Sequence, residues 1–280
     1  WILVKKVAAV YSGTKIPAVI SFLFFPSVVF WSSGIIKESI AMSCLFYLTY
    51  IILKIFKHES LTLYHGLMAI FLTWLLWNLK YYYLAVFLPV AFTTLSVQFL
   101  VTRFPVNGLV IKIFLWAIVF IVPLLAVSFL HPNFYPQRFM EVVVSSYHEY
   151  ETISEPDDLI HYHSLKATPL SLIQNTPMAL VSGLYRPFLT EANSFLQFCI
   201  AVENLILIML SIGAISNVKK MLNSEYRLLL VSILIYTVLL CIFLALSAPN
   251  FGTLSRYRVG FLPYFVLLLT IDNPLINKLM

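Results

Sequence analysis

The stretch LLLVSILIYTVLLCIFLALS, residues 228–247, holds twenty consecutive residues without a charge. About twenty apolar residues are what an α-helix needs to cross the hydrocarbon core of a bilayer. The chain contains seven or eight such stretches, and we expect transmembrane helices at roughly 16–33, 38–54, 61–78, 82–102, 109–130, 194–216, 228–247 and 258–273. The sequence therefore predicts an all-α fold, a polytopic membrane helix bundle of about eight transmembrane helices.

The composition excludes several classes of protein. The 280 residues are 61% hydrophobic and 11% charged, whereas a soluble domain carries roughly 25% charged residues. A soluble domain, a nucleic-acid-binding protein, a disulfide scaffold and a disordered chain are therefore not expected. The net charge of +6 needs no anionic partner, because cations gather in the cytoplasmic loops of membrane proteins. Cys44, Cys199 and Cys241 lie in apolar runs and are expected to be small membrane-buried residues.

The distribution of cations predicts an orientation. If the N-terminus is cytoplasmic and every run crosses, eleven of the eighteen Lys and Arg residues lie inside, as the positive-inside tendency favours. The seven outer cations are Lys37, Lys80, Arg138, Lys166, Arg186, Arg256 and Arg258. The prediction depends on segment 78–83, which could be a tight external turn or a helix break inside the membrane. Without a turn there, every later segment changes sides.

One long polar loop, residues 131–193, lies outside in this topology and holds seven of the twelve acidic residues. Loops of this length are usually functional, so we expect it to cap a single-domain bundle spanning residues 1–280. The apolar part near 176–189 is expected to form an interfacial helix. The sequence EPDDLIHYH, residues 155–163, could bind a divalent metal, but an acidic solvated loop is the stronger interpretation. We therefore predict no metal and no cofactor.

Two outer segments place cations beside membrane runs. In FFPSVVFWSSGIIKESI, residues 24–40, Glu38 suits the positive end of a helix, whereas Lys37 does not. Lys37 is either part of an anion site or an ordinary snorkelling lysine. Arg256 and Arg258 in the sequence Ser-Arg-Tyr-Arg could recognise a phosphate or pyrophosphate. The alternative is that they pair with carboxylates of the long loop.

Four further residues complete the candidate binding residues. Arg186 and Glu191 bracket a proline turn and could also be a structural ion pair. Glu203 lies about ten residues into an apolar run, where it is a packing residue, a buried base or the partner of a buried cation. Lys80 precedes three tyrosines that could stack on a sugar. The predicted topology puts four outer cations at the same level of the membrane. We therefore predict that they converge on one external cavity: Lys37, Arg186, Arg256 and Arg258.

Three motifs carry a resemblance to a known group of proteins. FPSVVFWSSGIIKESIAM, LYRPFLTEAN followed by AVENL, and SRYRVGFLP resemble polytopic proteins of bacterial surface-polysaccharide loci. They look like GT-C-type glycosyltransferases and oligosaccharide-repeat polymerases. This resemblance spans residues 24–40, 184–205 and 255–263. It implies a lipid bilayer and a polyprenyl-(pyro)phosphate-linked saccharide as partners, further membrane-protein partners, and the external face of the bacterial inner membrane as the place of action.

The resemblance also bears on catalysis. GT-C enzymes place a catalytic carboxylate in their first external loop, and here Glu38 is the residue available for that role. The other possibilities are a carboxylate of the 131–193 loop or one in a segment preceding Trp1, which we favour. The leading hypothesis is a membrane glycosyltransferase or polysaccharide polymerase. The alternatives are a non-catalytic subunit of an envelope or secretion complex and a flippase for lipid-linked sugars, which should show inverted repeats.

Overall fold

The computed structural model describes residues 1–104 and 108–278, and this part of the chain is helical, without a β-strand. A single β-bridge joins Leu159 to Asn250. The helices are α1 (Ile2–Val10), α2 (Lys15–Val19), a π-helix (Ile20–Phe24), α3 (Pro26–Ser33), α4 (Lys37–Phe56), α5 (Leu63–Arg103), α6 (Leu109–Leu130), α7 (Pro136–Ile153), α8 (Pro169–Tyr185), α9 (Phe195–Ile215), α10 (Val218–Asn223), α11 (Arg227–Ser247), α12 (Phe251–Tyr257), α13 (Leu262–Thr270) and α14 (Pro274–Asn277). Short 3₁₀ turns cover 132–134, 156–158, 189–191 and 258–260.

Four helices are long and apolar enough to cross a membrane: α4, α5, α9 and α11. A fifth span results if α2 with the π-helix (Lys15–Phe24) is counted together with α3. These two segments are bent by 46° relative to each other. The bend follows from Pro26, which begins α3 because a proline lacks the N–H that would continue the preceding helix. The all-helical class is therefore confirmed, and the apolar helices indicate contact with a lipid bilayer.

The chain reverses direction within α5. An unbroken helix of 41 residues would be about 60 Å long, twice the thickness of a hydrocarbon core. Lys80 breaks it, with φ −150° and ψ 67°. Near one end of α5, His65 lies 3.5 Å from Lys54. Near the other end, Val101 lines a cavity with Arg227. Both ends therefore lie by the C-terminus of α4 and the N-terminus of α11, which is the turn that the sequence offered as one possibility for 78–83.

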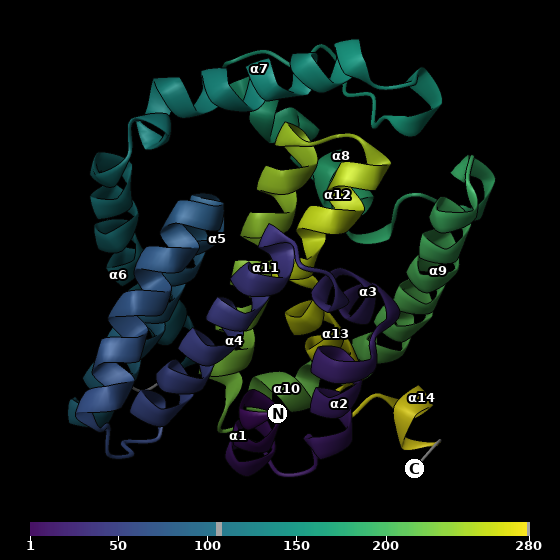
Figure 1. The fold of residues 1–280 in the computed structure, drawn as a ribbon. Helices are drawn as coiled ribbons and strands as arrows, with labels where there is room; N and C mark the ends of the chain where they lie inside the picture. Colours follow the sequence, from purple (N-terminus) through teal and green to yellow (C-terminus); the bar gives the residue numbers. More distant parts are fainter. Residues whose placement is uncertain (105–107, 279–280) are drawn as a thin grey trace.

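The last apolar run differs from the prediction of a membrane span over 258–273. It is divided into a 3₁₀ turn and α13, which has only nine residues. All nine residues of α13 are buried, from Leu262 to Thr270, and Figure 1 shows this helix in the middle of the bundle. A helix that is apolar on every side is equally suited to a protein core and to lipid. The hydropathy of this run reflects the protein core.

The bundle has two distinct ends (Figure 1). We call the end crossed by α7 the cap end; α1 and α10 lie at the opposite end. Helix α8 does not lie flat on the cap end as the predicted interfacial helix would. It packs into the bundle, where the Tyr185 hydroxyl is 2.9 Å from that of Ser211 and the Cys241 thiol faces the Leu180 carbonyl. Segment 176–189 thus contacts α9 and α11.

Candidate functional site

A buried carboxylate organises the cap end of α4 and α5. Glu38 lies in the first turn of α4 and is only 3% exposed. Its Oε1 is 2.9 Å from Nζ of Lys80 and 3.2 Å from Nε of Arg256. Together with Tyr257, these residues form what we call the Glu38 cluster. The cluster joins the start of α4, the break in α5 and the C-terminal turn of α12.

The aromatic ring of Tyr257 supports Lys80 from a second side. Lys80 Nζ lies 3.6 Å from the centroid of the Tyr257 ring and 5.7 Å from that of Tyr82. A cation at such distances is attracted by the negative face of an aromatic ring. The hydroxyl of Tyr83 donates a hydrogen bond to the carbonyl of Tyr257. Because Lys80 and Tyr83 follow each other closely in α5, the break in that helix and the position of α12 are coupled.

The Glu38 cluster contains more positive than negative charge. Lys80 is buried, but the side chain of Arg256 is 42% exposed, and the adjacent Lys37 is exposed. Among the described residues, Lys37 belongs to no ion pair. Two cations on one carboxylate leave one positive charge in excess. An anion approaching Arg256 from solvent would meet this excess.

Arg258 points away from this cluster and into the interior. It is 1% exposed, and its Nη2 lies 3.2 Å from Oε1 of Glu203 while its Nη1 donates to Oδ1 of Asn204 over 2.7 Å. The second oxygen of Glu203 accepts the N–H of Ser27 over 2.7 Å. A buried ion pair persists when further hydrogen bonds satisfy both partners. Glu203 is therefore the partner of a buried cation, one of the interpretations that the sequence left open.

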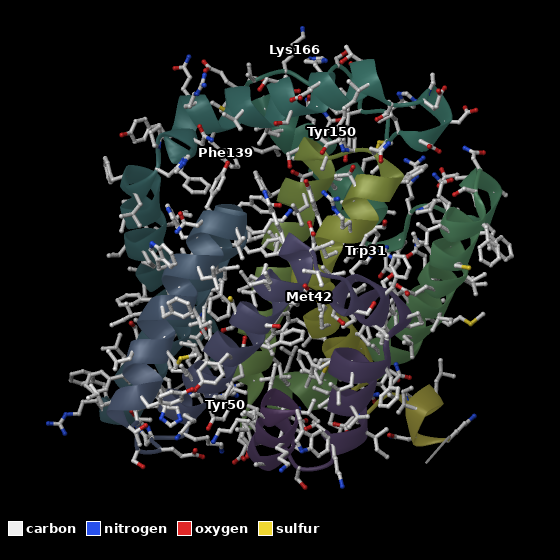
Figure 2. All side chains as sticks on the ribbon, viewed as in Figure 1. Trp31, Met42, Tyr50, Phe139, Tyr150 and Lys166 are labelled. Atoms are coloured by element: carbon white, nitrogen blue, oxygen red, sulfur yellow. The ribbon has the colours of Figure 1, made fainter. Side chains whose placement is uncertain are left out.

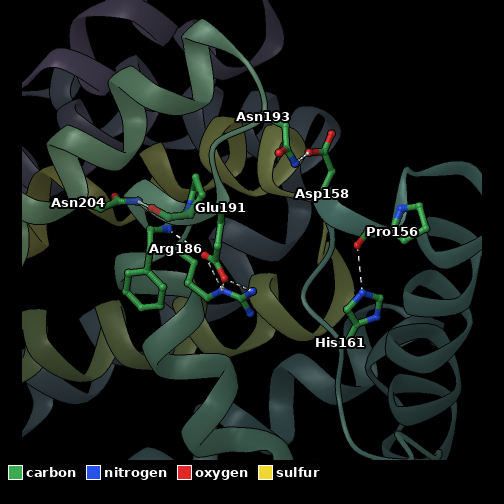
Figure 3. A network of polar contacts seen from close by, with 9 residues as sticks. Pro156, Asp158, His161, Arg186, Glu191, Asn193 and Asn204 are labelled. Carbon is green, nitrogen blue, oxygen red and sulfur yellow. Dashed lines mark hydrogen bonds and ion pairs between the residues drawn. The ribbon is translucent and has the colours of Figure 1, made fainter.

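Arg186 and Glu191 form a third, separate ion pair (Figure 3). Nε of Arg186 donates to both carboxylate oxygens of Glu191 over 3.0 Å, and the N–H of Phe188 donates to one of them over 2.8 Å. Burial alone would raise the pKa of Glu191, but the Arg186 guanidinium and this N–H outweigh it and hold the pKa below its ordinary value. Arg186 also lies over the ring of Phe251. This arrangement is that of a structural pair closing the Pro187 turn.

The expected convergence of four cations on one cavity is not observed. Arg256 meets Glu38, Arg258 meets Glu203 and Arg186 meets Glu191. None of these cations, nor Lys37, lines any of the five cavities described for residues 1–104 and 108–278. Arg256 and Arg258 diverge because the backbone continues helically from α12 into the 3₁₀ turn, and two residues along a helix turn a side chain by more than half a circle. Of the predicted binding residues, the structure brings together Lys80 and Arg256, both at Glu38.

The acidic segment 155–163 has a structural role in this fold. Oδ1 of Asp158 accepts from Asn193 over 3.3 Å (Figure 3). It also accepts from Gln197 over 2.9 Å, which ties the segment to the start of α9. Nε2 of His161 lies 3.0 Å from the carbonyl oxygen of Pro156. In the described part of the chain, no three His, Cys, Asp or Glu side chains gather as metal ligands would.

Sequence reasoning missed how the cluster is assembled. Lys80, Glu38 and Arg256 were each identified from the sequence, but the pairing of Lys80 with Glu38 and the role of Tyr257 were not. A lysine at the point where two apolar runs meet was the available signal, since such a cation needs a partner. Comparisons of the chain with protein-family models, with curated proteins and with solved structures find no match.

Proposed function

We propose that this protein is a membrane glycosyltransferase or polysaccharide polymerase that acts on polyprenyl-(pyro)phosphate-linked sugars at the external face of the bacterial inner membrane. The observation that supports it most directly is the excess of positive charge in the Glu38 cluster, where two cations meet one carboxylate. Arginine forks suit phosphate oxygens, and the partly exposed Arg256 is placed to receive them. The resemblance of the motifs at 24–40 and 255–263 to polysaccharide-locus proteins supports the choice of substrate.

Within this proposal, Glu38 positions cations. A carboxylate that neutralises Lys80 and Arg256 at 2.9 and 3.2 Å is a weak proton acceptor. We therefore give Glu38 the role of holding Lys80 and Arg256 in place for the phosphate. This replaces the catalytic role expected from the sequence. A carboxylate outside the cluster would act as base.

Replacement of Arg256 tests the proposal. Arg256→Gln removes the exposed cation of the cluster and should lower the affinity for inorganic pyrophosphate about tenfold or more, since one charge-assisted hydrogen bond contributes about 1.5–3 kcal/mol. The matched control is Arg138→Gln on α7, because the side chain of Arg138 is 60% exposed and pairs only with Glu141 of the same helix. Cells that depend on the protein should lose surface polysaccharide with the first variant and keep it with the second.

A non-catalytic membrane subunit is the second candidate. The observation that favours it is that Arg258 is paired with Glu203 and Asn204, and Arg186 with Glu191, as expected of residues that only stabilise the fold. In that case Arg256→Gln would leave polysaccharide output unchanged. Variants that destabilise the bundle, such as those at Glu203, would lower output in proportion to the loss of folded protein.

A further inference from the structure

An apolar cavity of about 350 Å³ lies beside the Glu38 cluster. It is bounded by α5, α6 and α11 and by the start of α7. Of the side chains in its wall, only those of Tyr82 and Ser128 carry polar atoms. The Ser128 hydroxyl donates to the carbonyl of Leu125 in its own helix over 2.7 Å, so it offers little to a polar ligand. The cavity therefore suits a hydrocarbon.

Tyr82 forms a wall common to the cavity and the cluster. Its ring centroid lies 5.7 Å from Lys80 Nζ and 6.2 Å from the Tyr257 ring. It also lies 5.7 Å from the ring of Phe243, which lines the cavity and stacks on Phe139 at 5.7 Å. Figure 2 shows Phe139 on the side of α7 that faces the bundle. Cations and an apolar space are thus separated by one aromatic side chain.

The cavity extends along the helices away from the cations. Ala85 and Val86 in its wall follow the break at Lys80 by five and six residues, which corresponds to about 8–9 Å of helix. On α6, the wall reaches Phe120, ten residues before the end of the helix at Leu130, or about 15 Å. A molecule that fits has an anionic group at the level of Lys80 and an apolar chain parallel to α5.

We propose that this cavity holds the hydrocarbon chain of a single-chain lipid phosphate whose head group contacts Lys80 and Arg256. The inference rests on the proposed function and names the part of the fold that receives the lipid. A volume of about 350 Å³ lies at the lower end of the roughly 300–1,000 Å³ typical of small-ligand sites, which favours one chain over the two chains of a phospholipid. The charge excess of the cluster complements the phosphate.

The experiment compares a ligand with a chain and a ligand without one. The protein is reconstituted in phosphatidylcholine nanodiscs, and the binding of a C15 prenyl pyrophosphate and of inorganic pyrophosphate is measured. Ser128→Phe fills the cavity from α6. Its control is Ala117→Phe on the same helix, which lines a different cavity together with Lys112 and Arg227. We expect Ser128→Phe to weaken prenyl pyrophosphate binding at least tenfold and to leave inorganic pyrophosphate unaffected. Ala117→Phe should change neither.

The outcomes separate this inference from the proposed function. Unchanged prenyl affinity in Ser128→Phe, together with an effect of Arg256→Gln on inorganic pyrophosphate, overturns the chain site and leaves the anion site standing. If Arg256→Gln weakens the binding of neither ligand, both the chain site and the anion site are overturned. Should Ser128→Phe fail to fold, Ala85→Phe fills the cavity from α5. A photoreactive prenyl phosphate should cross-link to peptides containing Phe139 or Phe243 in the unaltered protein, and cross-links confined to other helices contradict the proposal.

Discussion

Removal of the negative charge of Glu203 should destabilise the bundle strongly. Glu203→Gln keeps the shape of the side chain and an oxygen for the N–H of Ser27, but it leaves Arg258 as an uncompensated charge at 1% exposure. Breaking a buried ion pair in this way costs about 3–5 kcal/mol. At about 2–4 °C per kcal/mol for a chain of 150–250 residues, the unfolding temperature should fall by about 6–20 °C.

The assay is thermal unfolding in detergent, followed by the fraction of protein that still elutes as a monodisperse peak after heating. The exposed pair of Arg138 and Glu141 provides the control, because exposed ion pairs contribute about 0–1 kcal/mol; Glu141→Gln should lower the unfolding temperature by at most a few degrees. The double variant Glu203→Gln/Arg258→Met, which has no buried charge left in this pair, should recover much of the loss. Equal unfolding temperatures for Glu203→Gln and Glu141→Gln would refute this reasoning.

Three further predictions concern the turn of Pro187, the packing of α5 and the orientation of the bundle. The folded-state pKa of Glu191 is below its ordinary value of 4.5, so the ion pair with Arg186 stabilises the fold above pH 4.5 and stops doing so as the pH falls through the folded-state pKa. The stability difference between wild type and Glu191→Gln should therefore shrink on acidification. A difference that stays constant from pH 7 to pH 3 contradicts this. A Cβ on Gly260 would lie 2.6–2.8 Å from ring atoms of Tyr83, so Gly260→Ala should cost about 1–3 kcal/mol in the same thermal assay, whereas Gly66→Ala, with no atom within 4 Å of the new Cβ, should not. In a Cys199→Ser background, Glu149→Cys should react with an impermeant thiol reagent from outside and Lys220→Cys should not; the reverse pattern would invert the proposed topology.

The helices α4, α9 and α11 could be predicted from sequence because each is one largely apolar run of about twenty residues without a proline. The run at 258–273 could not be assigned correctly. Hydropathy measures transfer from water and does not distinguish lipid from the interior of a protein, and α13 is buried on all sides. The position of α8 was missed for the same reason. Its apolar stretch needed shelter from water, and α11 provides that as well as a membrane surface does.

The candidate site shows a different limit of sequence reasoning. All of its charged residues could be selected, because charges beside apolar runs are costly and therefore conspicuous. Their partners could not be assigned, because Arg256 and Arg258 are separated by one residue yet meet carboxylates on α4 and α9. Two residues later in a helix a side chain has turned by more than half a circle, so the sequence spacing indicated divergence. Residues at the same depth in the membrane can still point to different sides of the bundle, which is why the four cations do not converge.

Lys80 connects the topology of the protein to its candidate site. The break at this residue allows the chain to reverse, and a break inside a helix leaves backbone groups without their usual partners. A charged residue at such a position is costly unless it is paired, and Glu38 and the ring of Tyr257 supply that pairing. The partners come from segments 42 and 177 residues away in sequence, so the cluster forms only when the hairpin of α5 has docked against both α4 and α12. An anion bound at Arg256 would act on the same carboxylate that holds Lys80. Binding should therefore also stabilise the hairpin of α5, because the contacts that hold the anion are the contacts that hold the hairpin.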